Sequence, residues 1–144
     1  MCLASHSRKT PEQPGYSLCS AAASLAFHST HMRADVVRTE AFRAAIGVLC
    51  RGKVVLDVGT GDAALFALEA ARAGATRVFA VEGDSASAAR ARLAVGAAED
   101  AGVVADGTVT VLNLLSTELS AGDLDGAAVR HSFAFGRTRL MLAG

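Results

Sequence analysis

A glycine turn between an apolar strand and a helix is the feature that most constrains this chain. Lys53–Val58 reads KVVLDV, a short run whose apolar stretch is interrupted only by Asp57. Such a run is typical of a strand buried on both faces. The turn Gly59-Thr60-Gly61 follows at once, and a helix is expected to open near Asp62. At this position a Gly-x-Gly turn lets the backbone approach a ligand closely at the carboxyl end of a sheet.

The rest of the chain continues the alternation of strands and helices. The sequence predicts a helix over 35–49, strands over 53–58, 77–81 and 108–113, one helix from near Asp62 to Gly74, and one from Asp84 or Ser85 to near Gly102. This order implies parallel strands joined by right-handed crossovers, with helices on both faces of the sheet. The predicted fold class is α/β: a Rossmann-like parallel sheet, incomplete, with its first three strands and flanking helices.

The 144 residues ordinarily hold one domain. Residues 1–26 contain both prolines and many serines without a clear period, and they are expected to form a mobile leader. The Rossmann-like domain with its preceding helix is expected over 27–125. Residues 126–144 are an atypical basic tail. Two interpretations of this tail stay open: it is a stray segment of a truncated or misread gene, or the alternation from Val129 to Phe135 forms a strand that covers the otherwise bare edge of the first strand.

The distribution of charge excludes some ligands. The net charge is zero, but it is +2 over residues 1–50, −5 over 51–125 and +3 over 126–144. An acidic central segment argues against nucleic acid as the main ligand, because phosphate binding needs a basic face. It suits a cationic ligand better.

Composition narrows the compartment and excludes a membrane span. No run of about 18 apolar residues occurs. The three cysteines, Cys2, Cys19 and Cys50, match neither a disulfide framework nor a zinc pattern. We therefore expect a cytoplasmic or nuclear protein without a metal site.

Two classes of cofactor fit the glycine turn. The stretch Gly59–Ala64 satisfies the dinucleotide fingerprint, in which Ala can replace the third Gly, and Glu82 follows about 20 residues on, where an acid binds ribose hydroxyls. A nicotinamide enzyme and a methyltransferase therefore fit equally well on these residues alone.

Two carboxylates favour S-adenosylmethionine over a dinucleotide. Asp62, expected in the first turn of the following helix, would repel a pyrophosphate by about 1 kcal/mol at 4 Å even in bulk water. S-adenosylmethionine carries a sulfonium cation and no phosphate, so it tolerates this carboxylate. Asp57, in an otherwise apolar strand end, needs a hydrogen-bond donor, and an ammonium or hydroxyl group of a ligand would supply one.

Three blocks of sequence, in order, resemble the protein arginine N-methyltransferase family of class I methyltransferases. The first is the helix MRADVVRTEAFRAAI, residues 32–46. The second is VVLDVGTGDAALFALEAARAGATRVFAVEGD, residues 54–84, and the third is VTVLNLLSTEL, residues 109–119. The resemblance covers about residues 27–122, which is the cofactor-binding part of that family.

The resemblance implies a set of cofactor-binding residues. Arg38 would pair with the carboxylate of S-adenosylmethionine, since a planar guanidinium forms two parallel bonds with a carboxylate. Glu82 would hold the ribose and Glu118 would accept from the adenine amino group. Gly59 and Gly61 would pass close to the cofactor. Asp57, in the same site, would lie under the methionine part.

The sequence also departs from the family pattern. Ala63 stands where the family usually has a further Gly, and no Ser-Glu stretch with the two substrate-clamping glutamates follows Glu118. No catalytic residue is identified for that reason, and neither the β-barrel-like substrate domain nor its dimerisation arm is found.

We therefore expect an S-adenosylmethionine-dependent enzyme that methylates arginine in a protein substrate, truncated before the substrate-clamping glutamates. The alternative is a non-catalytic module that binds the cofactor or a partner chain. A fragment of a nicotinamide-dependent oxidoreductase is a third possibility, supported only by the shared fingerprint.

Overall fold

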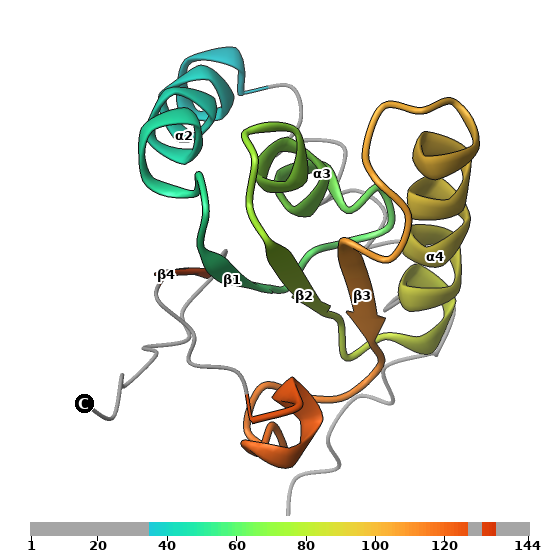
Figure 1. The fold of residues 1–144 in the computed structure, drawn as a ribbon. Coiled ribbons are helices and arrows are strands. Elements are labelled where there is room, and N and C mark those ends of the chain that lie inside the picture. Colours follow the sequence, from blue (N-terminus) through green and yellow to red (C-terminus); the bar gives the residue numbers. More distant parts are fainter. Residues whose placement is uncertain (1–34, 127–130, 135–144) are drawn as a thin grey trace, which may run out of the picture.

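A parallel sheet with α-helices packed on one side forms the centre of the computed structural model, which describes residues 35–126 and 131–134 (Figure 1). The elements are α2 (Val36–Leu49), β1 (Val54–Val58), α3 (Leu65–Arg72), β2 (Arg77–Val81), α4 (Ser85–Asp100), β3 (Val109–Leu112), the 3-10 helix η1 (Gly122–Leu124) and β4 (His131–Ala134). The strand order is β3-β2-β1-β4, and each neighbouring pair is parallel. The expected leader, residues 1–26, lies outside the described residues. No helix in the described part of the chain is both long and apolar enough to cross a membrane.

Local chemistry explains where the helices start and end. The side chain of Asp35 accepts a hydrogen bond from the Arg38 backbone N–H at 3.0 Å and caps α2. Asp84 caps α4 in the same way, accepting from the Ser87 N–H at 2.7 Å. A carboxylate at this position satisfies a backbone donor that the helix itself leaves open. At the far end of α3, Gly74 takes a φ of 91°, a conformation that stops the helix and that glycine adopts without a steric penalty.

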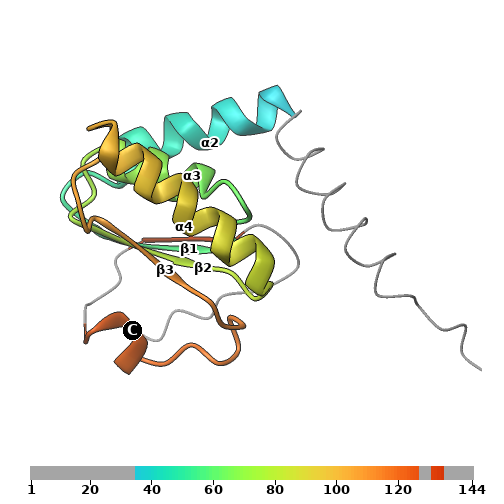
Figure 2. The ribbon, with the colours of Figure 1, turned by 90° about the vertical axis from the view of Figure 1, so that its right-hand side faces the viewer.

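All three α-helices of the described chain cover the same face of the sheet, as Figure 2 shows. The expectation of helices on both faces is therefore wrong. The physical reason is the direction of travel: from β1 to β2 to β3 the chain moves the same way across the sheet. Two right-handed crossovers that move in the same direction place their helices on the same side. Only a reversal of direction would place a helix on the other face.

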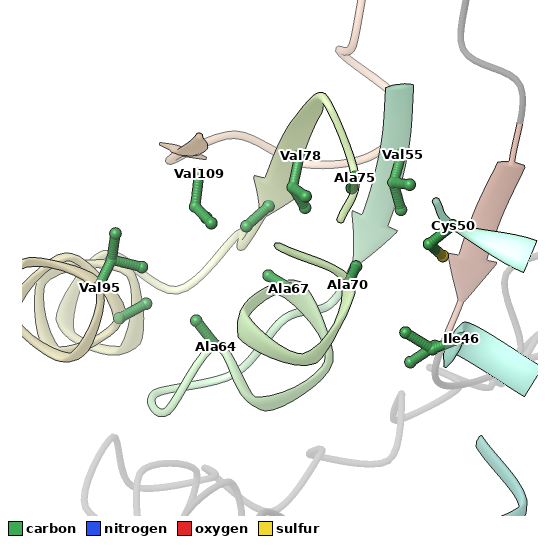
Figure 3. Packing of buried hydrophobic residues seen from close by; sticks show 12 residues of the cluster. Ile46, Cys50, Val55, Ala64, Ala67, Ala70, Ala75, Val78, Val95 and Val109 are labelled. Atoms are coloured by element: carbon green, nitrogen blue, oxygen red, sulfur yellow. The ribbon is translucent and has the colours of Figure 1, made fainter. Parts of the chain in front are cut away.

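The two faces of the sheet have separate hydrophobic clusters. On the helical face, side chains of the strands meet α2, α3 and α4 around Val55, Val78 and Ile46, which are 0%, 0% and 1% exposed (Figure 3). On the opposite face, Leu56 and Phe79 meet leucines of the segment between β3 and the end of η1. That segment covers the face of the sheet opposite the α-helices.

A fourth strand completes the order on the far side of β1. The sequence predicted a strand from the tail at this edge, and β4 pairs in parallel with β1, with Val55 opposite His131 and Val58 opposite Ala134. The sheet therefore has four strands in the described residues rather than three. β1, with its buried valines and leucine, lies between two partners and is not an edge strand.

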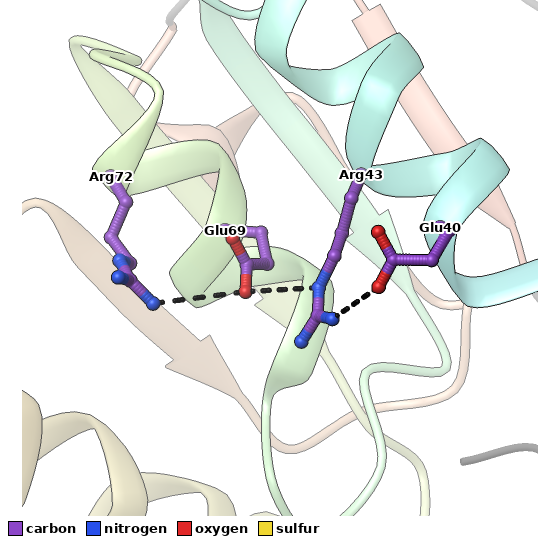
Figure 4. Close-up of polar contacts among 4 residues, drawn as sticks. All are labelled: Glu40, Arg43, Glu69 and Arg72. Atoms are coloured by element: carbon purple, nitrogen blue, oxygen red, sulfur yellow. Dashed lines mark hydrogen bonds and ion pairs between the residues drawn. The ribbon is translucent and has the colours of Figure 1, made fainter. Parts of the chain in front are cut away.

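Ion pairs join α2 to α3 on the outside of the helical layer. Arg43 donates from Nη1 to Glu40 Oε1 at 2.8 Å within α2, and its Nε lies 3.3 Å from Glu69 Oε1 of α3 (Figure 4). Arg72 Nη1 lies 3.8 Å from the same Glu69 oxygen. The neighbouring carboxylates raise the pKa of Arg43, mainly through the hydrogen bond with Glu40. Arg43 thus links α2 to the helix that follows the glycine turn through exposed ion pairs.

Candidate functional site

The glycine turn lies at the carboxyl ends of β1 and β2 and is bonded to β2. The N–H groups of Gly59 and Thr60 both donate to the carbonyl oxygen of Val81, at 2.8 and 3.1 Å. Gly59 and Gly61 have φ values of 75° and 70°, in the left-handed region where a side chain costs energy. No neighbouring atom lies within 4 Å of the position where Gly61 would carry a Cβ. Both predicted glycines therefore have a conformational reason to be glycine, and space remains open beside the second.

Asp57 is a buried carboxylate with an unused acceptor. Its side chain is 1% exposed, and Oδ2 accepts from the Thr60 hydroxyl at 2.7 Å. Oδ1 is buried and has no hydrogen-bond partner. Burial raises the pKa of Asp57 to about 6; the Thr60 hydroxyl and the Ala67 backbone N–H oppose this, and the negative charge of Glu82 adds to it. The Ala67 N–H lies near the carboxylate and stabilises its charged form, but it makes no hydrogen bond of normal geometry with Oδ1.

An unsatisfied buried acceptor is rare in folded proteins, because leaving it unpaired costs about 1–3 kcal/mol. The incompletely satisfied carboxylate of Asp57, bonded to Thr60 of the glycine turn, marks this end of β1 as a candidate ligand-binding site.

Glu82 connects the glycine turn to the start of α4. Its Oε2 accepts from the Gly61 N–H at 2.9 Å, and its Oε1 accepts from the Asp84 N–H at 3.0 Å. One side chain thus holds two loops together, across a separation of 21 residues between Gly61 and Glu82. Sequence reasoning placed Glu82 at the site but did not foresee that its carboxylate would bond both loops.

Asp62 does not lie in the first turn of a helix. Residues 61–64 form a turn, α3 begins at Leu65, and Ala64 adopts the left-handed conformation with φ 47° and ψ 37°. A residue in that conformation breaks the helical path, so α3 cannot extend back to Asp62. Asp62 instead lies with Oδ2 3.8 Å from Arg90 Nε of α4. The expected repulsion of a pyrophosphate by Asp62 at a helix N-terminus therefore loses its basis, and the argument for S-adenosylmethionine rests on Asp57 and on the comparisons below.

Arg38 lies on α2, outside the sheet. Its guanidinium carbon is 5.9 Å from the centre of the Phe42 ring, within reach of a cation–π interaction. The Phe42 ring in turn lies 5.3 Å from that of Phe66, in the first turn of α3. Aromatic contacts thus connect Arg38 to the helix that follows the glycine turn.

Glu118 lies in the segment after β3 and bonds locally. Its Oε2 accepts from the Leu115 N–H at 3.1 Å, and the side chain is exposed. The same segment reaches the site through Leu115, because a Cβ on Gly83 would lie only 2.7 Å from Leu115 Cδ2. The structure thus places Glu118 on a loop that packs beside the residue following Glu82.

Three neighbouring residues escaped the sequence analysis as members of the site. Thr60 satisfies one oxygen of Asp57, Gly83 gives Leu115 room, and Asn113 donates from Nδ2 to the Glu82 carbonyl at 2.9 Å. A polar residue directly after a strand was the available signal for Asn113. Among the described residues, no cluster of three or more His, Cys, Asp or Glu side chains has the arrangement of a metal site.

Comparison with known proteins relates this segment to one family of enzymes. No protein-family model matches the chain. A stretch of 59 residues is 48% identical to protein arginine N-methyltransferase PRMT10 of Oryza sativa subsp. japonica, covering 39% of this chain and 15% of that protein. A stretch of 72 residues is 49% identical to a probable protein arginine N-methyltransferase 3 of Arabidopsis thaliana, covering 48% of this chain and 11% of that protein. The matches therefore span only a small part of either relative.

Solved structures agree with these relatives. Protein arginine methyltransferase 10 of Arabidopsis thaliana matches with a TM-score of 0.54 and 33% identity, over 65% of this chain and 26% of that one. A crystal structure of PRMT6 matches with a TM-score of 0.56 and 30% identity, over 72% of this chain and 29% of that one. A methyltransferase from Agrobacterium tumefaciens, described as SAM-dependent, shares the fold at 18% identity and a TM-score of 0.50, over 69% of this chain and 30% of that one. Over its matched segment the chain is therefore homologous to the protein arginine N-methyltransferases, and it has the fold of their methyltransferase domain in part.

Proposed function

We propose that this chain binds S-adenosylmethionine, and that the protein it represents transfers the methyl group to an arginine of a protein substrate. The observation that carries the proposal is the buried, unpartnered Oδ1 of Asp57 beneath the glycine turn. A ligand that brings an N–H or O–H donor to this point removes the cost of the open acceptor. The family of the sequence relatives supports the choice of ligand.

The residues at the sheet edge fit such a ligand. Each oxygen of Glu82 already accepts one backbone N–H, but a carboxylate has about four lone-pair positions in all. Glu82 therefore keeps acceptor capacity for the two ribose hydroxyls while it holds the turn. Gly59 and Gly61 would face the ligand with backbone alone, Arg38 would pair with its carboxylate, and Glu118 would accept from the adenine amino group.

When bound, S-adenosylmethionine supplies an electrophilic methyl group on sulfur. The residues of this chain would bind and orient it, which accounts for much of the rate of a transfer between two positioned groups. The carboxylates of Asp57 and Glu82 would also attract the permanent positive charge of the sulfonium, more strongly in a site of low dielectric constant than in water. Methyl transfer to an arginine also requires carboxylates that hold the substrate guanidinium, in addition to the residues that bind S-adenosylmethionine.

A non-catalytic role in binding the cofactor is the second candidate. Residues 126–144 contain three arginines and no Asp or Glu, so they offer no carboxylate pair for a guanidinium. On this candidate the chain binds S-adenosylmethionine but transfers nothing by itself.

Isothermal titration calorimetry of the full chain tests the proposal. We expect S-adenosylmethionine to bind in the micromolar range and NAD not to bind. Arg38→Ala should weaken binding by about 1–3 kcal/mol, because it removes hydrogen bonds to a charged group. Arg72→Ala, an exposed arginine of α3 whose ion pair with Glu69 is long, is the matched control and should leave binding unchanged. No binding by a folded chain, or binding of NAD instead, would contradict the proposal.

Transfer of labelled methyl groups to an arginine-rich peptide then separates the two candidates. Binding together with labelled peptide supports a working methyltransferase. Binding without labelled peptide favours the non-catalytic role.

A further inference from the structure

Thr60, the middle residue of the glycine turn, joins two neighbouring strands at the carboxyl edge of the sheet. Its backbone N–H donates to the Val81 carbonyl of β2 at 3.1 Å. Its hydroxyl donates to Asp57 Oδ2 of β1 at 2.7 Å. Both lengths are normal for hydrogen bonds between such groups. The Thr60 hydroxyl is therefore held at a defined place beside the Asp57 carboxyl group.

The Asp57 carboxyl group lies in surroundings that disfavour its negative charge. Asp57 is 1% exposed. In the sheet it lies opposite Ala80 of β2 and Phe133 of β4, so neither neighbouring strand has a charged residue at that register position. From the end of β2, the negative charge of Glu82 disfavours ionisation further. Burial, with this like charge, raises the pKa of Asp57 to about 6.

Among the described residues, two hydrogen-bond donors act on the carboxyl group in the opposite direction. The Thr60 hydroxyl lowers the pKa of Asp57 more than the Ala67 N–H of α3 does. An ionised carboxylate only accepts hydrogen bonds, whereas a neutral carboxyl group also carries a proton that needs an acceptor. A hydroxyl held beside Oδ2 therefore favours the anion over the neutral form.

We propose that Thr60 is a positioning residue of the site, whose hydroxyl keeps the buried carboxyl group of Asp57 ionised and oriented for a cationic ligand. Thr60 acts through Asp57 and does not need to touch the ligand. The inference rests on the proposed function, in which Asp57 meets the positively charged S-adenosylmethionine. It gives the middle residue of the turn a role that the Gly-x-Gly pattern by itself does not require, since that pattern leaves the middle position open.

A purely structural role is the competing explanation. A hydrogen bond between side chains three residues apart can stabilise the turn without any influence on the charge of the site. The two roles differ in their dependence on pH. Loss of a structural contact weakens ligand binding by the same factor at every pH, whereas loss of a donor to the anion moves the pH at which Asp57 ionises.

Carbon-13 NMR of the aspartate carboxyl groups in the ligand-free full chain is the first test, with Asp57→Asn to assign the signal. We expect wild-type Asp57 to titrate near pH 6. Thr60→Val keeps the shape of the side chain but removes the hydroxyl, and it should raise the midpoint by about one pH unit, because a hydrogen bond to a charged group is lost. Thr60→Ser keeps the hydroxyl and should titrate like the wild type.

Thr76→Val is the matched control for the titration. Thr76 is exposed and lies before β2, at the edge of the sheet opposite the site, so the midpoint of Asp57 should not change. Equal midpoints in the wild type and Thr60→Val would overturn the proposal. Circular dichroism verifies that the variants are folded. If Thr60→Val does not fold, Thr60→Ala, which is smaller and also lacks the hydroxyl, replaces it in both tests.

Isothermal titration calorimetry with S-adenosylmethionine between pH 5 and pH 8 is the second test. The affinity of the wild type should rise with pH as Asp57 ionises. Thr60→Val should bind up to about tenfold more weakly at the lower end and nearly as well as the wild type at the upper end. The reason is that one pH unit corresponds to a tenfold difference in the ionised fraction well below the midpoint, and to little difference above it. Thr60→Ser should follow the wild type.

The outcomes separate this inference from the proposed function. A loss of affinity in Thr60→Val by the same factor at every pH would show a purely structural role and would overturn the inference. No binding by the wild type at any pH would contradict the proposed function, and with it the role of Thr60 toward a ligand. The NMR titration would still decide whether Thr60 controls the ionisation of Asp57.

Discussion

At the scale of single residues, two carboxylates of the site are held in opposite ways. Glu82 has a backbone donor on each oxygen, whereas Asp57 is buried with one oxygen satisfied by Thr60 and the other left open. The pKa of Asp57 rises because burial disfavours its charged form more than the Thr60 hydroxyl favours it. Ionised Asp57 therefore lowers the stability of the folded protein, and a ligand that donates a hydrogen bond to it would restore part of that stability.

The first prediction concerns the pH dependence that Asp57 gives to stability. Its pKa in the folded protein, about 6, is above the ordinary value of 3.8, so the folded state binds more protons than the unfolded chain between these values. Asp57 therefore makes folding less favourable as the pH rises from about 4 to about 6, by roughly 2–3 kcal/mol in total. Urea unfolding should show the free energy of unfolding of the wild type falling relative to Asp57→Asn across this interval.

The control for this prediction is Asp106→Asn, because Asp106 is exposed. Its free energy of unfolding should follow that of the wild type at every pH. A constant difference between the wild type and Asp57→Asn from pH 4 to pH 8 would contradict the assignment. If S-adenosylmethionine bonds to ionised Asp57, its affinity should also increase with pH over the same interval.

The second prediction is that Glu82 stabilises the fold even without a ligand. In Glu82→Gln one carboxylate oxygen becomes an NH₂ group, which cannot accept from Gly61 or Asp84. We expect a loss of about 1–2 kcal/mol in the free energy of unfolding, measured by urea titration. Glu118→Gln changes the same kind of group where it is exposed and where one bond, from Leu115, is found within the described residues, and it should have a smaller effect. Equal effects of the two variants would mean that Glu82 does not hold the two loops together.

At the scale of elements, the sequence was informative about strands and less so about helix starts and faces. The strand 77–81 has the predicted bounds, and Asp84 is one of the two residues predicted to cap α4, because apolar runs and capping residues are local signals. The start of α3 was wrong by one turn, since the left-handed conformation of Ala64 has no signal in an alanine. The face that each helix covers was wrong because it depends on the direction in which the chain crosses the sheet.

The same distinction applies to the site. The glycine turn and the two carboxylates were foreseen from residue type and spacing, because they follow apolar strands whose carboxyl ends share one edge of the sheet. Two long-range hydrogen bonds were not foreseen, because they join segments 21 and 31 residues apart. They are the bond between Glu82 and Gly61 and the bond between Asn113 and the Glu82 carbonyl. Contacts of that range need the three-dimensional fold.

The third prediction tests how α2 is attached. Ile46 is 1% exposed and belongs to the cluster on the helical face of the sheet. Ile46→Ala should lower the free energy of unfolding by about 2–4 kcal/mol, from the lost burial and the cavity that remains. Leu93→Ala removes comparable apolar volume from an exposed position and should change stability little. Thermal or urea unfolding measures both, and a small effect of Ile46→Ala would mean that α2 is not part of the cooperative core.

At the scale of the whole molecule, β4 determines whether β1 is an interior strand or an edge strand of the sheet. β1 carries the glycine turn at its end and lies between β2 and β4 in the order β3-β2-β1-β4. With β4 in place, the backbone groups of β1 have partners on both sides. The strand that positions the candidate site therefore depends on residues 131–134, which follow it by more than 70 residues.

The fourth prediction follows from this dependence. A chain that ends at residue 126 lacks β4 and leaves one edge of β1 unpaired, next to Val55 and Leu56, which are 0% and 3% exposed. An unpaired edge with apolar side chains is a template for pairing with other chains, so we expect the shortened chain to aggregate or to unfold at lower temperature. Size-exclusion chromatography and thermal unfolding of the two chains measure this difference.

Hydrogen exchange of the full chain provides the complementary result. Alternate amides of β4 should exchange much more slowly than in denaturant, because in an edge strand of a parallel sheet only every second residue bonds to the neighbour. Full exchange of these amides within seconds, together with an unchanged shortened chain, would show that β4 contributes nothing to the sheet.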